Sequence, residues 1–216
     1  MKSIVAILLL LAGVALAQAP TLQQDLSDKT PEEVTLLKQI DADPDSAESH
    51  FRIGEFYTRA QQYEEAAGFL KKAIQINPVY AEAYFYLALN YDQLDQQAEA
   101  IEAYKRATEI NPDYSVAYYD MGLTLRELRR YEEAILAFRE AARSDPEDAH
   151  VYLQMALSYY YLGDRRGAKK CVNTAVRMRP DITRGPVDYV LGEGIFELLN
   201  MPRQNQMGFI NVTSNA

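Results

Sequence analysis

The chain has 216 residues, of which 48% are hydrophobic and 25% are charged, which is the usage of a folded soluble protein rather than of a disordered, collagenous or polytopic membrane chain. Its 31 acidic and 22 basic residues give a formal net charge of −9. This charge argues against a nucleic-acid partner, because binding to a phosphate backbone depends on cationic groups. One cysteine and two histidines exclude a disulfide framework and a zinc-finger-type metal site.

The first 17 residues have the layout of a secretory signal peptide. Lys2 gives a positive start, residues 4–16 are an uncharged apolar run, and Ala15 and Ala17 are the small residues expected before a cleavage point. A retained membrane anchor is the alternative, but the run is shorter than the roughly 20 apolar residues that span a bilayer. We therefore expect an exported protein, periplasmic if the source is bacterial and otherwise secreted or in the secretory pathway, which meets the membrane only through its signal peptide.

A single helix is expected over residues 30–44, with residues 18–29 as a flexible leader ahead of it. Thr30 can cap this helix, Pro31 suits its first turn, and the two glutamates that follow favour a helix N-terminus. The segment aligns with the second helix of the repeat described next. It is therefore interpreted as a half-repeat that shields the first full repeat.

The body of the chain repeats every 34 residues. Five prolines mark the period: Pro44, Pro78, Pro112, Pro146 and Pro180. The first four follow an Asn or Asp, and such a pair is typical of turns because the residue before proline is pushed out of the helical region. Four consecutive units can be aligned, and positions within each are numbered from its own first residue: 47–80, 81–114, 115–148 and 149–182.

Each unit has the pattern of two amphipathic helices. Small residues recur in register at positions 8, 20 and 27, namely Gly54, Ala88, Gly122 and Ala156, then Ala66, Ala100, Ala134 and Ala168, then Ala73, Ala107, Ala141 and Ala175. Positions 4, 8 and 11, and again 20, 24 and 27, follow the i, i+4, i+7 spacing of one helix face. Two such helices cannot bury their apolar faces alone, so the four stacked units are expected to form one continuous core.

The pattern resembles the tetratricopeptide repeat family over residues 47–182, four times in succession without an insertion. In the second unit, eight residues stand at signature positions of the family: Tyr84, Leu87, Ala88, Tyr91, Ala100, Tyr104, Ala107 and Pro112. His50, Leu125 and Ser144 depart from the family pattern. The resemblance implies an all-α, right-handed superhelical solenoid of antiparallel helix pairs, and a non-enzymatic module that binds other proteins.

The repeat pattern stops after the fifth proline. Residues 186–200 are expected to form a C-terminal capping helix that closes the last repeat, followed by a polar tail over 201–216. The apolar residues of that helix are Val187, Val190, Leu191, Ile195, Leu198 and Leu199.

No group of residues indicates catalysis. The two histidines, His50 and His150, lie about three repeats apart, which is too far for them to share a site in a solenoid. The sequence has no paired His/Cys spacing for a metal, no glycine-rich loop for a phosphate and no Ser/His/acid grouping with local support. We expect no enzyme activity, no metal and no cofactor.

On the first helix of each unit, positions 4, 8 and 11 form the stripe expected to pack against the second helix. A second stripe, at positions 5, 9 and 12, is rotated about 100° from it. The resemblance implies that these positions, with position 13 in the last unit, line a concave groove that holds a peptide. The twelve candidate groove residues are Phe51, Glu55, Phe85, Leu89, Asp92, Tyr119, Leu123, Arg126, Leu153, Leu157, Tyr160 and Tyr161. Position 9 lacks the Asn with which many family members grip a carboxylate, so a hydrophobic segment or an amphipathic helix is the expected ligand.

Other interpretations stay open at this point. The stripe can serve packing between neighbouring helices, or the chain's own leader or tail can cover it. Charge is also uneven, since residues 18–48 carry a net charge of −6 and residues 149–182 one of +4. A self-assembling scaffold that joins acidic to basic ends is therefore the alternative to an adaptor in cell-envelope assembly or secretion, and a solvated helix face is the simplest explanation of the basic end.

Overall fold

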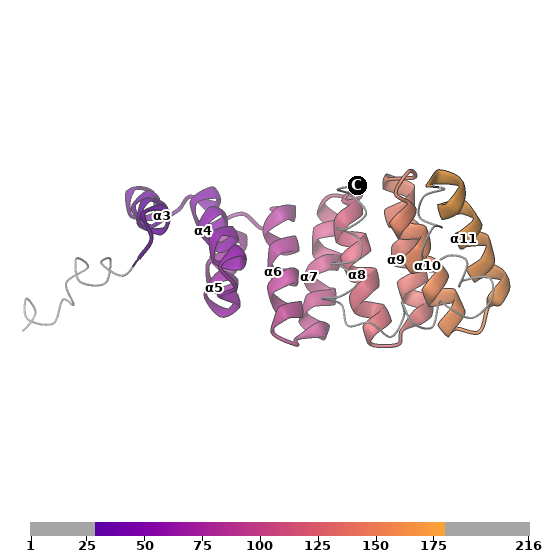
Figure 1. Cartoon of the computed structure of the whole chain (residues 1–216). Helices are drawn as coiled ribbons and strands as arrows, with labels where there is room; N and C mark the ends of the chain where they lie inside the picture. The colour runs from indigo at the N-terminus through magenta and orange to yellow at the C-terminus, as the bar shows by residue number, and fades with distance from the viewer. Residues whose placement is uncertain (1–28, 180–216) are drawn as a thin grey trace, which may run out of the picture.

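The computed structural model describes residues 29–179, and all secondary structure in that range is helical. Figure 1 shows the helices stacked side by side in chain order, from α3 at one end of an elongated array to α11 at the other. The expected all-α solenoid of antiparallel helix pairs is confirmed. The expected signal peptide, nearly all of the leader, the helix over 186–200 and the tail lie outside the described residues.

After α3 (Pro31–Ala42), four helix pairs follow, each with a first helix of 13 residues and a second helix of 14. The pairs are α4 (Ala47–Arg59) with α5 (Tyr63–Ile76), α6 (Ala81–Gln93) with α7 (Gln97–Ile110), α8 (Ser115–Glu127) with α9 (Tyr131–Ser144), and α10 (Ala149–Tyr161) with α11 (Arg165–Met178). The second helices α5, α7 and α9 also pack on the first helix of the next pair. The buried residues therefore form two successive clusters that run along the array.

The turns between pairs begin at an Asn or Asp whose side chain closes the turn. Asn77 Oδ1 accepts a hydrogen bond from the Val79 N–H at 3.2 Å, and Asn111 Oδ1 accepts one from the Asp113 N–H at 3.2 Å. Asp145 makes the equivalent bond in the third unit at 3.4 Å. The proline that follows each of them has no N–H with which to continue a helix, so the side-chain turn replaces the next helical bond.

The turns inside the pairs share a left-handed residue at position 15. These residues are Gln61, Asp95, Arg129 and Gly163, whose φ angles are 61°, 60°, 59° and 86°. The N–H of the following residue bonds to the carbonyl of position 11, as Gln62 does to Tyr57 at 2.9 Å, so each first helix ends in a Schellman motif. Only the fourth unit has the glycine that this backbone conformation favours.

Position 8 holds a small residue because the second helix of the same pair lies directly against it. A Cβ at Gly122 would lie 2.6 Å from the Phe138 ring, and a Cβ at Gly54 would lie 2.7 Å from Leu70. Both Phe138 and Leu70 are fully buried. The glycines therefore allow the close helix approach that their spacing in the sequence predicts.

Helix α3 is held against the first pair through a buried glutamate. Glu33 Oε1 accepts hydrogen bonds from the Tyr57 hydroxyl at 2.6 Å and from the Lys29 ammonium at 2.7 Å. Burial alone would raise the pKa of the Glu33 carboxyl, but these two bonds, the positive charge of Lys29 and a backbone hydrogen bond from Thr30 together outweigh burial and lower the pKa. Thr30 caps the helix by accepting a 3.2 Å bond from the Glu33 N–H, and Leu36 is buried in the same cluster as Tyr57.

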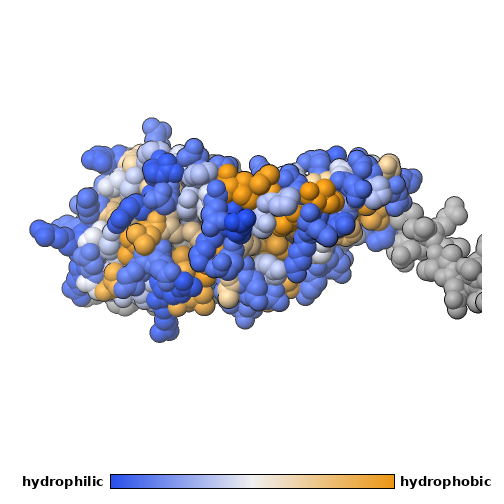
Figure 2. Space-filling model, turned by 180° about the vertical axis from the view of Figure 1, so that it is seen from behind, coloured by the Kyte–Doolittle hydropathy of each residue, from blue (hydrophilic) through white to orange (hydrophobic). Residues whose placement is uncertain are grey.

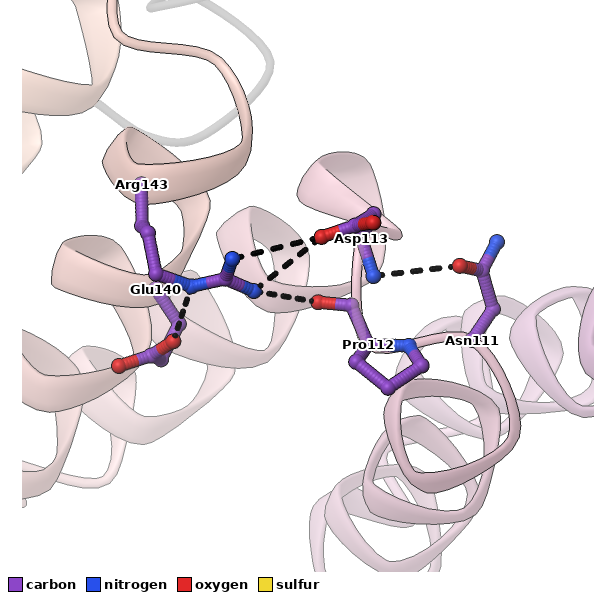
Figure 3. A network of polar contacts seen from close by, with 5 residues as sticks. All are labelled: Asn111, Pro112, Asp113, Glu140 and Arg143. Carbon is purple, nitrogen blue, oxygen red and sulfur yellow. Dashed lines mark hydrogen bonds and ion pairs between the residues drawn. The ribbon is translucent and has the colours of Figure 1, made fainter.

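Arg143 links α9 to the turn between the second and third pairs (Figure 3). Its guanidinium donates to the Pro112 carbonyl at 2.8 Å and to Asp113 Oδ1 at 3.3 Å, while its Nε donates to Glu140 Oε2 at 2.9 Å. The ion pairs are exposed and contribute little to stability. The bond to the carbonyl still fixes where this turn lies against α9.

The outer face of α11 differs from that of the preceding second helices. Position 21 is buried beneath the next pair in the first three units, where it is Ala67, Ile101 and Ile135, but in α11 it is the exposed Lys169. Four further basic residues of α11 are exposed, namely Arg165, Arg166, Lys170 and Arg177. Among the described helices, the last one therefore presents a charged face where the preceding second helices are covered.

Candidate protein-binding surface

All twelve predicted groove residues lie on the first helices of the pairs, α4, α6, α8 and α10, and we call them the first-helix row. Ten of them are half-buried, Phe85 is only 8% exposed, and Tyr161 is 42% exposed. Within the described residues the row is thus neither a sealed core nor a fully open surface. Part of most of its side chains remains accessible along the array.

Phe85 belongs to the core rather than to the surface. Its ring centroid lies 5.0 Å from that of Tyr114 and 6.1 Å from that of Tyr104. Tyr114 is the residue that precedes α8, so the ring of the next turn packs against Phe85. For this residue the structure supports internal packing, and little of its ring is left for a ligand.

Hydrogen bonds tie polar members of the row to the neighbouring pair. Asp92 Oδ2 accepts bonds from the Thr124 hydroxyl at 2.8 Å and the Tyr104 hydroxyl at 3.0 Å. One pair earlier, Asn90 Nδ2 donates to Thr58 Oγ1 at 2.8 Å. In both cases a residue at position 12 of one first helix bonds to the residue at position 10 of the first helix in the next pair.

Position 10 holds a further set of polar residues that the helical stripes in the sequence did not indicate. Its residues Asn90, Thr124 and Ser158 are fully buried. The signal that could have revealed them is the recurrence of a small polar residue in register in three units. Further along the row, Arg126 donates a hydrogen bond to Gln154 Oε1, so its guanidinium also serves the contact between pairs.

An unbroken series of aromatic contacts runs along the first two pairs. The ring centroids of Tyr80 and Phe51 lie 4.9 Å apart, those of Phe51 and Tyr86 5.4 Å, and those of Tyr86 and Phe85 5.7 Å. Phe85 continues the series to Tyr114. We call these five residues the aromatic cluster. The predicted stripe contains Phe51 and Phe85 but not the three tyrosines, which stand at positions 34 and 6.

Carboxylates accept hydrogen bonds from the hydroxyl groups of two of these tyrosines. The Tyr80 hydroxyl donates to Glu48 Oε2 at 2.5 Å, and the Tyr86 hydroxyl donates to Glu55 Oε1 at 3.1 Å. Burial, and then these carboxylates, raise the pKa of both tyrosines. Burial likewise raises the pKa of Tyr114 to about 12. The hydroxyls are therefore neutral donors at physiological pH.

The second half of the row is richer in leucine. Leu123, Leu153 and Leu157 are half-buried, and burial raises the pKa of Tyr119 beside them to about 12. Tyr161 stacks on Tyr131 with a centroid distance of 5.2 Å and an interplanar angle of 12°. Apolar side chains are exposed at other sites too, namely Val79, Val116, Leu128, Leu136 and Leu162. On the face seen in Figure 2, apolar patches alternate with hydrophilic residues.

The described residues contain no cluster of three or more His, Cys, Asp or Glu side chains arranged to hold a metal ion. In the same range, no helix combines the length and the apolar character needed to cross a bilayer. What these residues present is a line of aromatic, leucine and carboxylate side chains carried on rigid helices.

The fold and this surface define an α-solenoid of paired 34-residue helical repeats. Models of the tetratricopeptide repeat match residues 45–113, 103–136 and 149–182. The chain therefore belongs to the tetratricopeptide repeat family, and as a member it is a protein-interaction module. No protein with a curated description matches it.

Several solved structures are similar to this chain. A crystal structure of MamA is 27% identical, with a TM-score of 0.66, over 70% of this chain and 89% of that one. MamA from Desulfovibrio magneticus RS-1 is 18% identical, with a TM-score of 0.64, over 74% and 91%. YrrB, described as a TPR protein with an unusual peptide-binding site, is 23% identical, with a TM-score of 0.61, over 69% and 77%. The last two likenesses show the fold alone.

Proposed function

We propose that this protein is an exported adaptor that binds a peptide segment of another protein along the first-helix row. The observation that carries the proposal is the row itself, which keeps half-buried aromatic and leucine side chains in line over four successive helix pairs. Contiguous apolar rows on a folded surface usually mark interaction sites. YrrB has the same fold and is described as having a peptide-binding site, which is consistent with this use of the surface.

The mechanism follows from how the row is held. Hydrogen bonds between pairs, such as Thr124 to Asp92, fix the first helices relative to one another. A preformed surface loses little conformational entropy when a ligand docks, so more of the contact energy appears as affinity. A segment laid along the row, either extended or as an amphipathic helix, would place its apolar side chains on Leu123 and Leu157.

Photo-crosslinking in the native compartment tests the site. A photoreactive residue at position 123 on α8 should give a discrete adduct, whereas one at position 136, exposed on the second helix α9, should give none. A second test pairs Leu123→Asp and Leu157→Asp against the control Leu136→Asp. The substitutions Leu123→Asp and Leu157→Asp together should abolish partner capture while the helicity is retained. If the partner is still captured by this double variant, the row is not the binding site.

Export is part of the same proposal and rests on the layout of residues 1–17. Mass spectrometry of the protein from its native host should find a mature chain that begins at Gln18. If the host is bacterial, a role in cell-envelope assembly or secretion follows from that location. An intact Met1 on the functional protein would contradict the proposal.

A self-assembling scaffold is the second candidate function, and the charged face of α11 favours it. Lys169 is exposed where the preceding units are covered, while Asp41, Asp43 and Asp45 are exposed near the other end of the array. Light scattering at low and high salt separates the two functions. Large particles that dissociate in salt and in the variant Lys169→Glu would favour the scaffold, and a salt-independent monomer would favour the adaptor.

A further inference from the structure

The aromatic cluster lies among carboxylates rather than among cations. Glu48 and Glu55 accept hydrogen bonds from the hydroxyls of Tyr80 and Tyr86, at 2.5 and 3.1 Å. Glu82 is exposed on α6 and acts electrostatically on Tyr80 as well. These three carboxylates come from two successive first helices, so together they border one continuous ring surface, and we call them the carboxylate rim.

The rim retains an excess of negative charge. None of its three carboxylates forms an ion pair with another residue in the range 29–179. Arg59 is the cation that bears on Tyr86, and it already pairs with Glu32 at 3.2 Å. Arg52, also on α4, donates to Gln39 Oε1 at 3.4 Å. A ligand laid on the cluster therefore meets three carboxylates that form no ion pair within the described residues.

The rings suit a cationic ligand as well. A Lys or Arg side chain above an aromatic ring is attracted by the ring's quadrupole. This chain makes such contacts elsewhere, with Lys71 Nζ 5.2 Å from the centroid of Tyr91 and the Arg106 guanidinium carbon 5.9 Å from that of Tyr84. Apart from the buried Phe85, the rings of the aromatic cluster are half-buried and can offer the same contact to a partner.

Two other ligand classes fit this end of the row less well. A carboxylate ligand would be repelled by the rim, and the hydroxyls of Tyr80 and Tyr86 already donate hydrogen bonds to Glu48 and Glu55. A wholly apolar ligand would remove water from the carboxylates without replacing its hydrogen bonds, which is costly. The chain's own leader is also a poor ligand, because it contains Asp25 and Asp28.

We propose that the partner segment is cationic where it meets α4 and α6, with Lys or Arg side chains that alternate with apolar ones. Its cations would lie between the three rim carboxylates, and its apolar side chains would lie on the rings of Phe51 and Tyr86. This inference rests on the proposed function and names the chemistry of the partner. It also orients the ligand, because the leucine-rich half of the row on α8 and α10 would receive the apolar end.

Fluorescence anisotropy of labelled amphipathic peptides on the full mature chain tests the proposal. The three probes are about 14 residues long, or four helical turns, and place Lys, Ser or Glu between the same leucines. The Lys probe should bind most tightly and the Glu probe should not bind. Replacing Glu48, Glu55 and Glu82 by Gln should weaken the Lys probe about tenfold, because each exposed ion pair contributes a factor of about two.

The control variant changes Glu64, Glu65 and Glu132 to Gln, which removes the same charge from exposed sites on the second helices α5 and α9. It should alter the affinity less than about twofold. Equal weakening by both triple variants would overturn the proposal, since net charge alone would then explain binding. If the Ser or Glu probe bound tightly and lost its affinity in Leu123→Asp, the cationic specificity would be overturned. The first-helix row would still stand as the binding site. Binding of no probe would count against both the row and its cationic specificity.

Discussion

The left-handed residues at position 15 lead to a test of how the helix pairs turn. Gln61 and Arg129 have φ angles of 61° and 59°, and both side chains are exposed. An L-residue in this conformation costs about 1–2 kcal/mol, whereas glycine adopts it freely. We expect Gln61→Gly and Arg129→Gly each to raise the free energy of unfolding, because no packing is lost with either side chain.

The size of the gain follows from two opposing effects. Relief of the strained φ contributes about 1–2 kcal/mol, and the greater freedom of glycine in the unfolded chain takes back about 0.5–1 kcal/mol. A net gain of about 0.5–1 kcal/mol per site remains, which corresponds to about 2–4 °C in Tm per kcal/mol for a chain of this size. The sites lie in different units, so the double variant should gain close to the sum.

Urea unfolding followed by far-UV circular dichroism measures the effect as a shift of the midpoint at constant slope. Gly163→Ala should act in the opposite direction, since φ is 86° there. Lys72→Gly, at an exposed right-handed position within α5, is the matched control and should destabilise by about 1 kcal/mol. If glycine at positions 61 and 129 lowered the midpoint as it does at 72, the strain argument would fail.

Two further predictions concern packing and pH. Gly122→Ala should lower the free energy of unfolding by about 1 kcal/mol, because the cost of overpacking against Phe138 exceeds the gain in helix propensity. In the double variant with Phe138→Leu, urea unfolding should show a loss smaller than the sum of the two single losses. Tyr114 and Tyr119 have pKa values raised from 10.0 to about 12, so the folded state binds their protons more tightly than the unfolded chain does. Their stabilisation is complete below pH 10 and should be lost as the pH rises from 10 to 12, and Tyr119→Phe should flatten that loss of unfolding free energy. A profile that is equally steep in this variant would contradict the assignment.

Much of the fold could be predicted from local patterns. The Asn/Asp-Pro pairs predict the turns between pairs, and the structure shows why, since the Asn77 and Asn111 side chains close those turns. The left-handed turns inside the pairs gave a weaker signal, because Gly163 is the only glycine among four equivalent positions. There the tertiary contact between the two helices holds Gln61, Asp95 and Arg129 in a conformation that their residue types disfavour.

The surface could be predicted only in part. The 3.6-residue period placed all twelve candidate residues on the first helices, but it could not separate those that face a ligand from those that face the next pair. Phe85 is buried because Tyr114, 29 positions later, packs on its ring. The carboxylate partners of Tyr80 and Tyr86 are likewise 32 and 31 residues away. A helical period carries no information on contacts at that separation.

By itself, the sequence determined the all-α repeat of paired helices and which face of each described helix is buried, since these properties depend on residues within one or two helical turns. Only the tertiary structure decided that a series of aromatic rings bordered by carboxylates runs across α4 and α6. It also decided that Asp92 and Arg126 form hydrogen bonds to the next helix pair. The physical reason is that stacking sets the neighbours of each first helix. Exposure and charge at a given position therefore depend on side chains one repeat away.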